Sequence, residues 1–128
     1  MEPAVNIVSD RPNPKTWVVR FARPDLRAVL YDSSPISDCE LYQELRSAVL
    51  SKLEPGETLV VNFGLLEWMP SIFFILLIEM RNEVATKEAK LVLCNFPPLI
   101  RESFDVMGGS RLFDVRATEA RAVAEANK

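Results

Sequence analysis

Residues 58–78 read TLVVNFGLLEWMPSIFFILLI, and this stretch decides the fold of the chain. Its first part, Thr58–Phe63, is almost wholly apolar and has the length of a strand that is buried on both faces of a sheet. The seven unbroken apolar residues Ile72–Ile78 follow a proline and a serine, and the segment is long enough to continue as a helix to Asn82 or Val84. A buried strand followed by an apolar helix predicts a sheet that is covered by helices.

The alternation of strand and helix continues on both sides of this stretch. We expect strands at residues 17–21, 27–31, 58–63, 89–96 and 111–115. We expect helices at residues 37–53, 71–84, 98–107 and 118–128, the first of them opened by a capping box of Ser37 and Glu40. This order predicts an α/β fold with a mixed, mostly parallel central sheet of about five strands, led by one hairpin, and about four helices.

The chain begins with a segment that does not look like a strand or a helix. Residues 1–16 hold three prolines together with Asn, Ser and Asp, which is typical of a flexible N-terminal arm. We therefore expect one folded domain at residues 17–128, a length that is enough to bury a hydrophobic core.

Composition argues against several classes of function. The net charge is -3 and the fifteen basic residues are scattered along the chain, which argues against a nucleic-acid partner. The chain has no histidine, so Ser-His-Asp and Cys-His catalysis and the commonest metal ligand are absent. The four glycines fit neither phosphate-binding motif, GxGxxG or GxxxxGK[ST]. We expect a protein that is not an enzyme, with no metal and no cofactor, although carboxylates from distant segments could still form a catalytic site.

The sequence also carries signals about location. The longest apolar run has seven residues, far short of the roughly 20 that a membrane span requires. The first fifteen residues lack the apolar region of a secretory signal. The two cysteines, Cys39 and Cys94, are best explained as free buried thiols in a reducing compartment, so we expect a cytoplasmic protein with no membrane span.

The helix that follows Pro70 is apolar on all sides. A helix on one sheet needs an apolar stripe of roughly 100°, whereas Ile72–Ile78 cover about two turns and point in every direction. Neighbouring helices, a second copy of the chain or another protein must cover the second face. We expect most of this run to be core, with Ile72 and Phe73 exposed at the first turn. Ser71 is either the N-cap of the helix or a phosphorylation site whose charge would repel an apolar or acidic partner.

The pattern resembles a known family. The shared features are a hairpin start, a buried strand that ends near Asn62, a helix that opens on Ser71, the strand KLVLCNF, and a tail that reads PPLIRESFDVMGGSRLFDV. Together they resemble the STAS domain family of anti-sigma-factor antagonists over about residues 17–125. In that family the corresponding helix begins with DSSG, whose first serine is phosphorylated. Ser71 aligns with that serine, while Pro70, Ile72 and Phe73 replace its three neighbours.

The resemblance implies a bacterial regulatory module that binds proteins in signal transduction and transcription regulation. It implies contact through the start of the second helix, regulation by phosphorylation of Ser71, and an anti-sigma-factor serine kinase or a second copy of the chain as the partner. The expected contact residues are Asn62, Trp68, Met69, Pro70, Ile72, Phe73 and Asn95. Two alternatives stay open: a soluble STAS-like subunit that binds a small anionic ligand or a lipid-transport complex, and a carboxylate-dependent enzyme.

Overall fold

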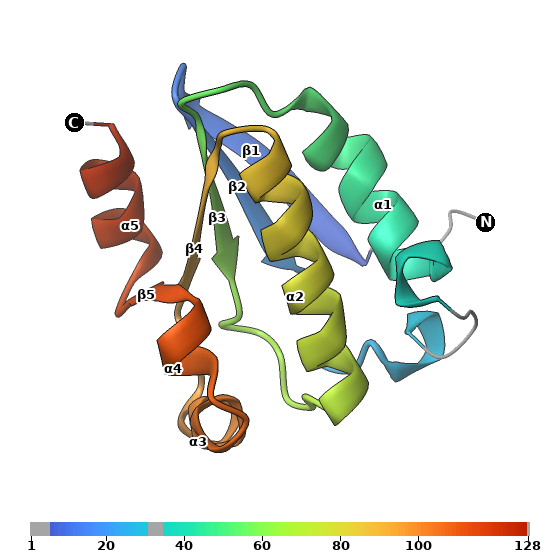
Figure 1. The fold of residues 1–128 in the computed structure, drawn as a ribbon. Helices are drawn as coiled ribbons and strands as arrows, with labels where there is room; N and C mark the ends of the chain where they lie inside the picture. Colours follow the sequence, from blue (N-terminus) through green and yellow to red (C-terminus); the bar gives the residue numbers. More distant parts are fainter. Residues whose placement is uncertain (1–5, 31–34, 128) are drawn as a thin grey trace.

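A mixed five-stranded sheet forms the centre of the molecule (Figure 1). The computed structural model describes residues 6–30 and 35–127. The strands lie in the order β1-β2-β3-β4-β5, with β1 antiparallel to β2 and the other neighbours parallel. The expected fold class, a mostly parallel mixed sheet of about five strands with helices, is therefore confirmed.

Strands and helices alternate after the initial hairpin, as predicted. The strands are β1 Ile7–Asn13, β2 Thr16–Phe21, β3 Thr58–Asn62, β4 Lys90–Cys94 and β5 Asp114–Arg116. The α-helices are α1 Glu40–Ala48, α2 Ser71–Thr86, α3 Pro98–Val106, α4 Gly109–Leu112 and α5 Glu119–Ala126. Three short 3-10 helices are η1 Arg27–Val29, η2 Ile36–Asp38 and η3 Leu50–Lys52.

The two faces of the sheet are covered unequally. Helices α1 and α2 pack on one face and α5 alone packs on the other, while α3 and α4 lie beyond the end of β4 (Figure 1). Because side chains alternate along a strand, Leu59 and Val61 of β3 enter the main core, whereas Val60 enters a small cluster with Val18, Cys94 and Ala122. This alternation explains why β3 is apolar at nearly every position.

The central helix α2 is buried on two sides. Its buried residues are Phe73, Phe74, Leu76, Leu77, Met80 and Val84. Phe74 contacts the rings of Phe104 and Phe113, which follow β4, at centroid distances of 6.0 Å each. Ile75 is the member of the apolar run that remains exposed, at 48%. The rest of the run is buried, or half-buried at Ile72 and Ile78, because neighbouring elements of the same chain cover it.

The initial hairpin does not lie where the sequence indicated. Residues 7–13 form β1, so the predicted arm is wrong for residues 7–16, and Asn6 is already bonded to Ala22 through its carbonyl. The strand predicted at residues 27–31 is instead the 3-10 helix η1 over Arg27–Val29, and residue 31 lies outside the described residues. Leu26, Val29 and Leu30 are all buried, and their i, i+3, i+4 spacing suits a helical turn better than a strand.

Two predicted helix starts also differ from the structure. The predicted capping box at Ser37 is wrong, because α1 begins at Glu40 and its N-cap is Cys39, whose Sγ accepts a hydrogen bond from the Tyr42 amide at 3.4 Å. Ser71 is the first residue of α2 rather than its cap, since Pro70 is the N-cap residue and makes no side-chain cap bond. Ser71 is therefore not needed to start the helix.

Candidate protein-binding site at the start of α2

The segment between β3 and α2 is anchored so that Trp68 faces outward. Leu66 is buried, and the amides of Glu67 and Trp68 both donate to the Pro24 carbonyl oxygen, at 2.8 and 3.3 Å. The Trp68 side chain remains 53% exposed, and the Arg27 guanidinium stacks over its ring at 4.5 Å. A large aromatic side chain fixed at the surface is typical of a protein contact.

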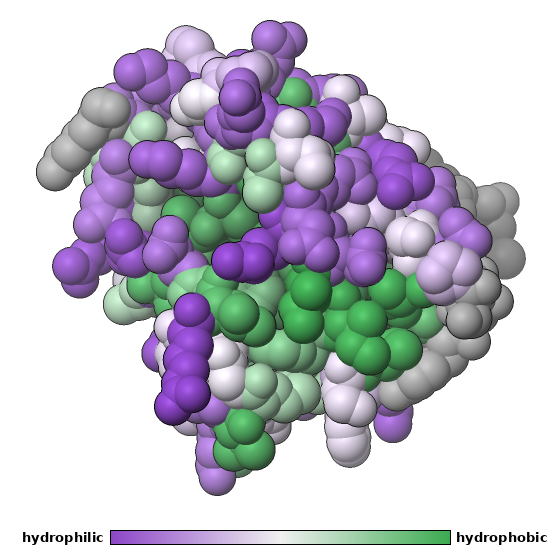
Figure 2. Space-filling model, viewed as in Figure 1, coloured by the Kyte–Doolittle hydropathy of each residue, from purple (hydrophilic) through white to green (hydrophobic). Residues whose placement is uncertain are grey.

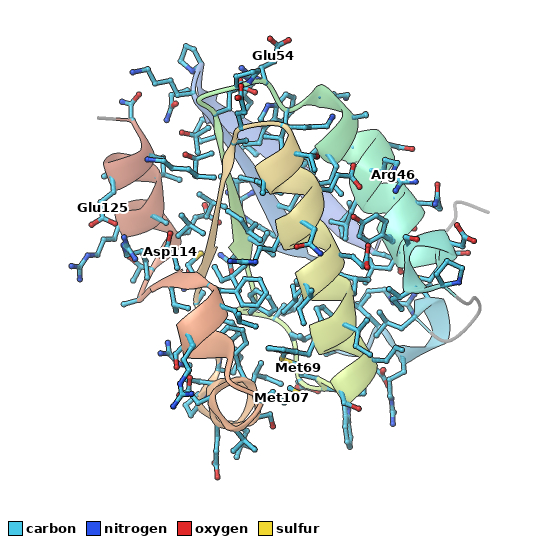
Figure 3. The ribbon with its side chains drawn as sticks, viewed as in Figure 1. Arg46, Glu54, Met69, Met107, Asp114 and Glu125 are labelled. Atoms are coloured by element: carbon cyan, nitrogen blue, oxygen red, sulfur yellow. The ribbon has the colours of Figure 1, made fainter. Side chains whose placement is uncertain are left out.

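An apolar groove runs beside this segment. It has a volume of about 520 Å³ and is lined by Met69, Ser71, Leu99, Glu102, Ser103, Val106 and Met107. Met69 and Met107 both line it, lie near each other in Figure 3, and are half-buried. Hydrophobic residues gather on the same face, over the first half of α2 and toward α3 (Figure 2). The groove therefore extends from the start of α2 along α3.

Ser71 lies at the mouth of this groove. Its side chain is exposed at the first position of α2, and the Pro70 carbonyl accepts a hydrogen bond from the Phe73 amide at 2.9 Å. The first amides of a helix lack intrahelical partners and carry a partial positive charge, so a phosphate there is stabilised. A modified Ser71 would place about two negative charges beside Met69 and the apolar wall of α3.

The two residues expected to be exposed at the first turn behave differently. The expectation is wrong for Phe73, which is 0% exposed and contacts the rings of Phe21 and Phe63 at 5.3 and 6.1 Å. It is buried because β2, β3 and α2 converge on it. Ile72 is only partly buried and packs at the edge of the same core. The apolar surface thus shifts from Phe73 toward Met69 and α3.

The two strand-end asparagines are engaged within the fold. The Asn62 Nδ2 donates to Glu119 Oε1 at 2.9 Å, and the Asn95 Oδ1 accepts from the Glu119 amide at 2.7 Å. Arg20 completes the cluster with two hydrogen bonds to the Glu119 carboxylate, at 2.7 and 2.8 Å. The hydrogen bonds from Arg20 and, to a smaller extent, Asn62 lower the pKa of Glu119 below its ordinary value. Asn62 and Asn95 thus hold α5 to the sheet.

The apolar side chains of α3 were missed as site residues. Leu99 is 77% exposed and Val106 is 83% exposed, whereas Ile100 and Phe104 are buried. In the sequence, Leu99, Ile100, Phe104 and Met107 recur at helical spacing, which does not separate buried from exposed positions. A separate stripe was already visible, because Leu99 and Val106 are seven residues apart and fall on one helix face.

A second, polar cleft lies on the opposite end of the sheet. It has a volume of about 860 Å³, and its lining includes Glu54, Asp114 and Glu125, labelled in Figure 3. Five basic residues also line it: Arg11, Lys15, Lys52, Lys90 and Arg116. Arg11 is paired with Glu57, and Arg116 is paired with Glu125. Within residues 6–30 and 35–127, no group of three or more acids or cysteines is arranged to hold a metal ion, and no helix has the length and apolar character of a membrane span.

The sheet order, the α2 crossover and the terminal α5 on the second face together define the STAS fold, the fold of anti-sigma-factor antagonists. The chain superimposes on solved structures that have this fold over nearly its whole length. The expected resemblance is thereby confirmed for the fold.

Three similar structures illustrate the match. An anti-sigma-factor antagonist (STAS) domain protein from Planctomyces limnophilus is 13% identical, with a TM-score of 0.69, 97% of this chain covered and 100% of that one. The anti-sigma factor antagonist SpoIIAA in its unphosphorylated form is 20% identical, with a TM-score of 0.66 and coverage of 94% and 96%. The Bacillus cell fate determinant SpoIIAA in its phosphorylated form is 23% identical, with a TM-score of 0.61 and coverage of 93% and 97%. No family model matches the chain, and no curated protein sequence matches it.

Proposed function

We propose that this chain is a non-catalytic, cytoplasmic STAS-domain regulator of bacterial type that acts by protein–protein contact through the start of α2. The observation that carries the proposal is the exposed apolar surface of Trp68, Met69 and the α3 groove, beside an exposed Ser71. A monomeric protein rarely leaves aromatic and aliphatic side chains together at its surface without a partner. Pro70 and Ile72 lie at the border of this surface, and Phe73 supports it from the core.

The similar structures suggest the kind of partner and its regulation. Their names describe anti-sigma-factor antagonists, so an anti-sigma-factor serine kinase is the leading candidate partner for this chain. SpoIIAA has been solved in both unphosphorylated and phosphorylated forms, and Ser71 occupies the first residue of α2 in this chain. Phosphorylation of Ser71 would bring a doubly charged group to the groove and weaken an apolar contact there.

The contact surface is tested by affinity purification from native cells with two matched variants. Trp68→Glu and Val8→Glu each place an acid at an exposed apolar position, but Val8 lies on the edge strand β1, away from the groove. We expect Trp68→Glu to lose the protein partner and Val8→Glu to retain it. Retention of every partner by Trp68→Glu, or the absence of any protein partner of the wild-type chain, would overturn the proposal.

The regulatory part has its own test. Ser71→Asp is expected to weaken partner binding at least about tenfold relative to Ser71→Ala, since it adds charge where the alanine adds none. Mass spectrometry of the protein from its own cells should detect phosphate on Ser71. If Ser71 stays unmodified under every stress condition, this regulation is wrong, while the contact surface still stands.

A second candidate function is the binding of a small anion in the polar cleft. Lys15, Lys52 and Lys90 come from three different segments and line one cleft, and none of the ion pairs among the described residues includes them. Ammonium groups that line one cleft without a carboxylate in an ion pair favour an anionic ligand. Pyrophosphate should raise the melting temperature of the wild-type chain and not that of Lys15→Gln/Lys90→Gln. An unchanged wild-type melting temperature would remove this candidate.

A further inference from the structure

We propose that the occupant of the α3 groove is an amphipathic helix of about three turns that carries one apolar stripe and a Lys or Arg facing Glu102. This inference rests on the proposed function, because it names the kind of partner segment that the start of α2 binds. The groove is the one lined by Met69, Ser71, Leu99, Glu102, Ser103, Val106 and Met107.

The helix α3 carries more apolar surface than its own core can use. Ile100 and Phe104 form the stripe that packs inward, and Phe104 contacts Phe96 at a ring-centroid distance of 4.6 Å. Leu99 and Val106 form a second stripe and are more exposed than any other large apolar side chain among residues 6–30 and 35–127. A nine-residue helix with two apolar stripes is expected to have a partner on each.

The shape of the surface suits a helix. Leu99 and Val106 are separated by seven residues, or about 10 Å along the axis, which matches two turns of a partner helix. Side chains of that partner at i, i+3 or i+4, and i+7 would enter the groove between α3 and the start of α2. Met69 and Met107 are half-buried lining residues of the groove, and a methionine side chain adapts readily to the shape of the group that packs against it.

Charge decides between the candidate occupants. Glu102 lies between Leu99 and Val106 on the groove side, and no ion pair or hydrogen bond of the described residues includes its carboxylate. Its neighbour Arg101 is already paired with Asp105 at 3.1 Å. A partner that covers the groove removes water from Glu102, which is unfavourable unless the partner supplies a cation. A second copy of the chain packed by the same helix would place two Glu102 carboxylates together, so charge favours a basic partner.

A displayed peptide library tests the inference without a known partner. Random 16-residue peptides would be selected on the wild-type chain and counter-selected on Leu99→Ser/Val106→Ser, which changes only exposed side chains. We expect enriched peptides to share apolar residues at i, i+3 or i+4, and i+7, to contain Lys or Arg, and to become helical when bound. Enrichment of other patterns, equal binding to both proteins, or no enrichment at all would overturn the inference.

A charge exchange then tests the role of Glu102. The affinity of the best peptide should fall roughly tenfold for Glu102→Lys and should be restored when its basic residue is changed to Glu. Glu88→Lys is the matched control, because Glu88 is exposed in the turn after α2, at the far end of that helix from the groove. An unchanged affinity for Glu102→Lys contradicts the inference.

The native partner separates failure of this inference from failure of the proposed function. If the partner is lost with Trp68→Glu but retained with both Leu99→Ser/Val106→Ser and Glu102→Lys, the contact surface stands and the helix-in-groove model is wrong. If Trp68→Glu retains the partner, the proposed function itself is wrong.

Discussion

Single side chains at the start of α2 divide sharply between core and surface. Phe73 is buried between the rings of Phe21 and Phe63, while Ile75, two residues later, is 48% exposed. Phe73→Ala should lower the free energy of unfolding by about 3–5 kcal/mol, because it removes a large buried ring and leaves a cavity. The control Ile75→Ala should cost less than about 1 kcal/mol. Urea denaturation measures both, and equal costs would contradict the placement of Phe73 in the core.

Gly109 allows the ring of Phe104 to approach the backbone. A Cβ built at Gly109 would collide with three ring atoms of Phe104, so the position has no room for a side chain. Gly109→Ala should therefore destabilise the chain by about 1–3 kcal/mol through overpacking. Ser110→Ala, at the exposed neighbouring position, is the control and should change the melting temperature little. A Gly109→Ala variant as stable as the wild type would show that α4 can shift away from Phe104.

The sequence predicted where the candidate site lies in the fold, but not which of its side chains are exposed. The seven-residue apolar run and its position after a buried strand located the start of α2, where Trp68 is exposed and Met69 is half-buried. The burial of Phe73 could not be read from the sequence, because it depends on Phe21, which lies in a strand 52 residues earlier. The exposed apolar stripe of α3 was missed because, in the sequence, one buried and one exposed apolar stripe on the same helix cannot be told apart.

At the scale of elements, α5 is held to the sheet by few apolar contacts. Ala122 is 1% exposed and belongs to the small cluster with Val18, Val60 and Cys94. Burial raises the pKa of the Cys94 thiol to about 12, which keeps it unreactive while α5 covers it. Ala122→Glu should displace α5 and speed modification of Cys94 by about tenfold or more. Peptide mass spectrometry after treatment with iodoacetamide would measure this.

Two internal controls make that result specific. Cys39 lies in the main core at the N-cap of α1 and should react as slowly as in the wild type. Ala124→Glu changes an exposed position of α5 and should leave both thiols protected. Equal acceleration at Cys39 and Cys94 would indicate global unfolding and contradict a local release of α5.

The ion pair at the N-terminus of α5 predicts a dependence on pH. Arg20 lowers the pKa of Glu119 in the folded state, so the stabilisation is complete above the unfolded-state pKa and is lost as the pH falls through the folded-state value. Glu119→Gln should therefore be less stable than the wild type at pH 7, by about 1 kcal/mol or less because the pair is partly exposed. The difference should shrink below about pH 4.5. Urea titrations at several pH values would test this, and a difference that grows in acid contradicts it.

Elements were predictable where burial imposed a clear pattern. Strands β3 and β4 were found because both of their faces are covered, which makes them apolar at nearly every position. Strand β1 was missed because it is an edge strand whose middle residues are exposed and include Asp10, Arg11 and Pro12. The polar sequence of β1 therefore gives no strand pattern, although pairing with β2 fixes the position of this strand.

At the scale of the whole molecule, the groove and the polar cleft lie at opposite ends of the one mixed sheet. The groove is built where β3 leads into α2 and β4 leads into α3. The cleft is built from the β1–β2 turn, the segment before β3, the start of β4, and residues of β5 and α5. A partner at one end therefore leaves the other end free, so the two candidate binding functions are compatible and can be tested on the same protein.

The edge strand β1 decides how much chain the domain needs. Residue 17, where the sequence predicted the domain to begin, lies inside β2, and a chain that starts at Lys15 would lose β1 entirely. It would expose the ladder of β2 and remove Arg11 from Glu57, whose side chain also accepts from Trp17 Nε1 and the Glu54 amide. We expect this shortened chain to be destabilised by several kcal/mol and to associate through the new edge.

The variant Arg11→Met separates the contribution of the Arg11–Glu57 ion pair to stability from that of strand β1 itself. This variant keeps β1 and loses the cation beside Glu57, so it should keep the association state of the full chain and be less destabilised than the chain that starts at Lys15. Urea denaturation followed by circular dichroism measures the stabilities, and light scattering measures association. Equal stability of the shortened and full chains would mean that β1 is an accessory strand and that the predicted boundary at residue 17 is the correct one. A stability loss in Arg11→Met as large as in the shortened chain would instead mean that β1 stabilises the domain only through the charge of Arg11. If the backbone pairing of β1 with β2 also contributes, removal of the whole strand must cost more than removal of one side chain.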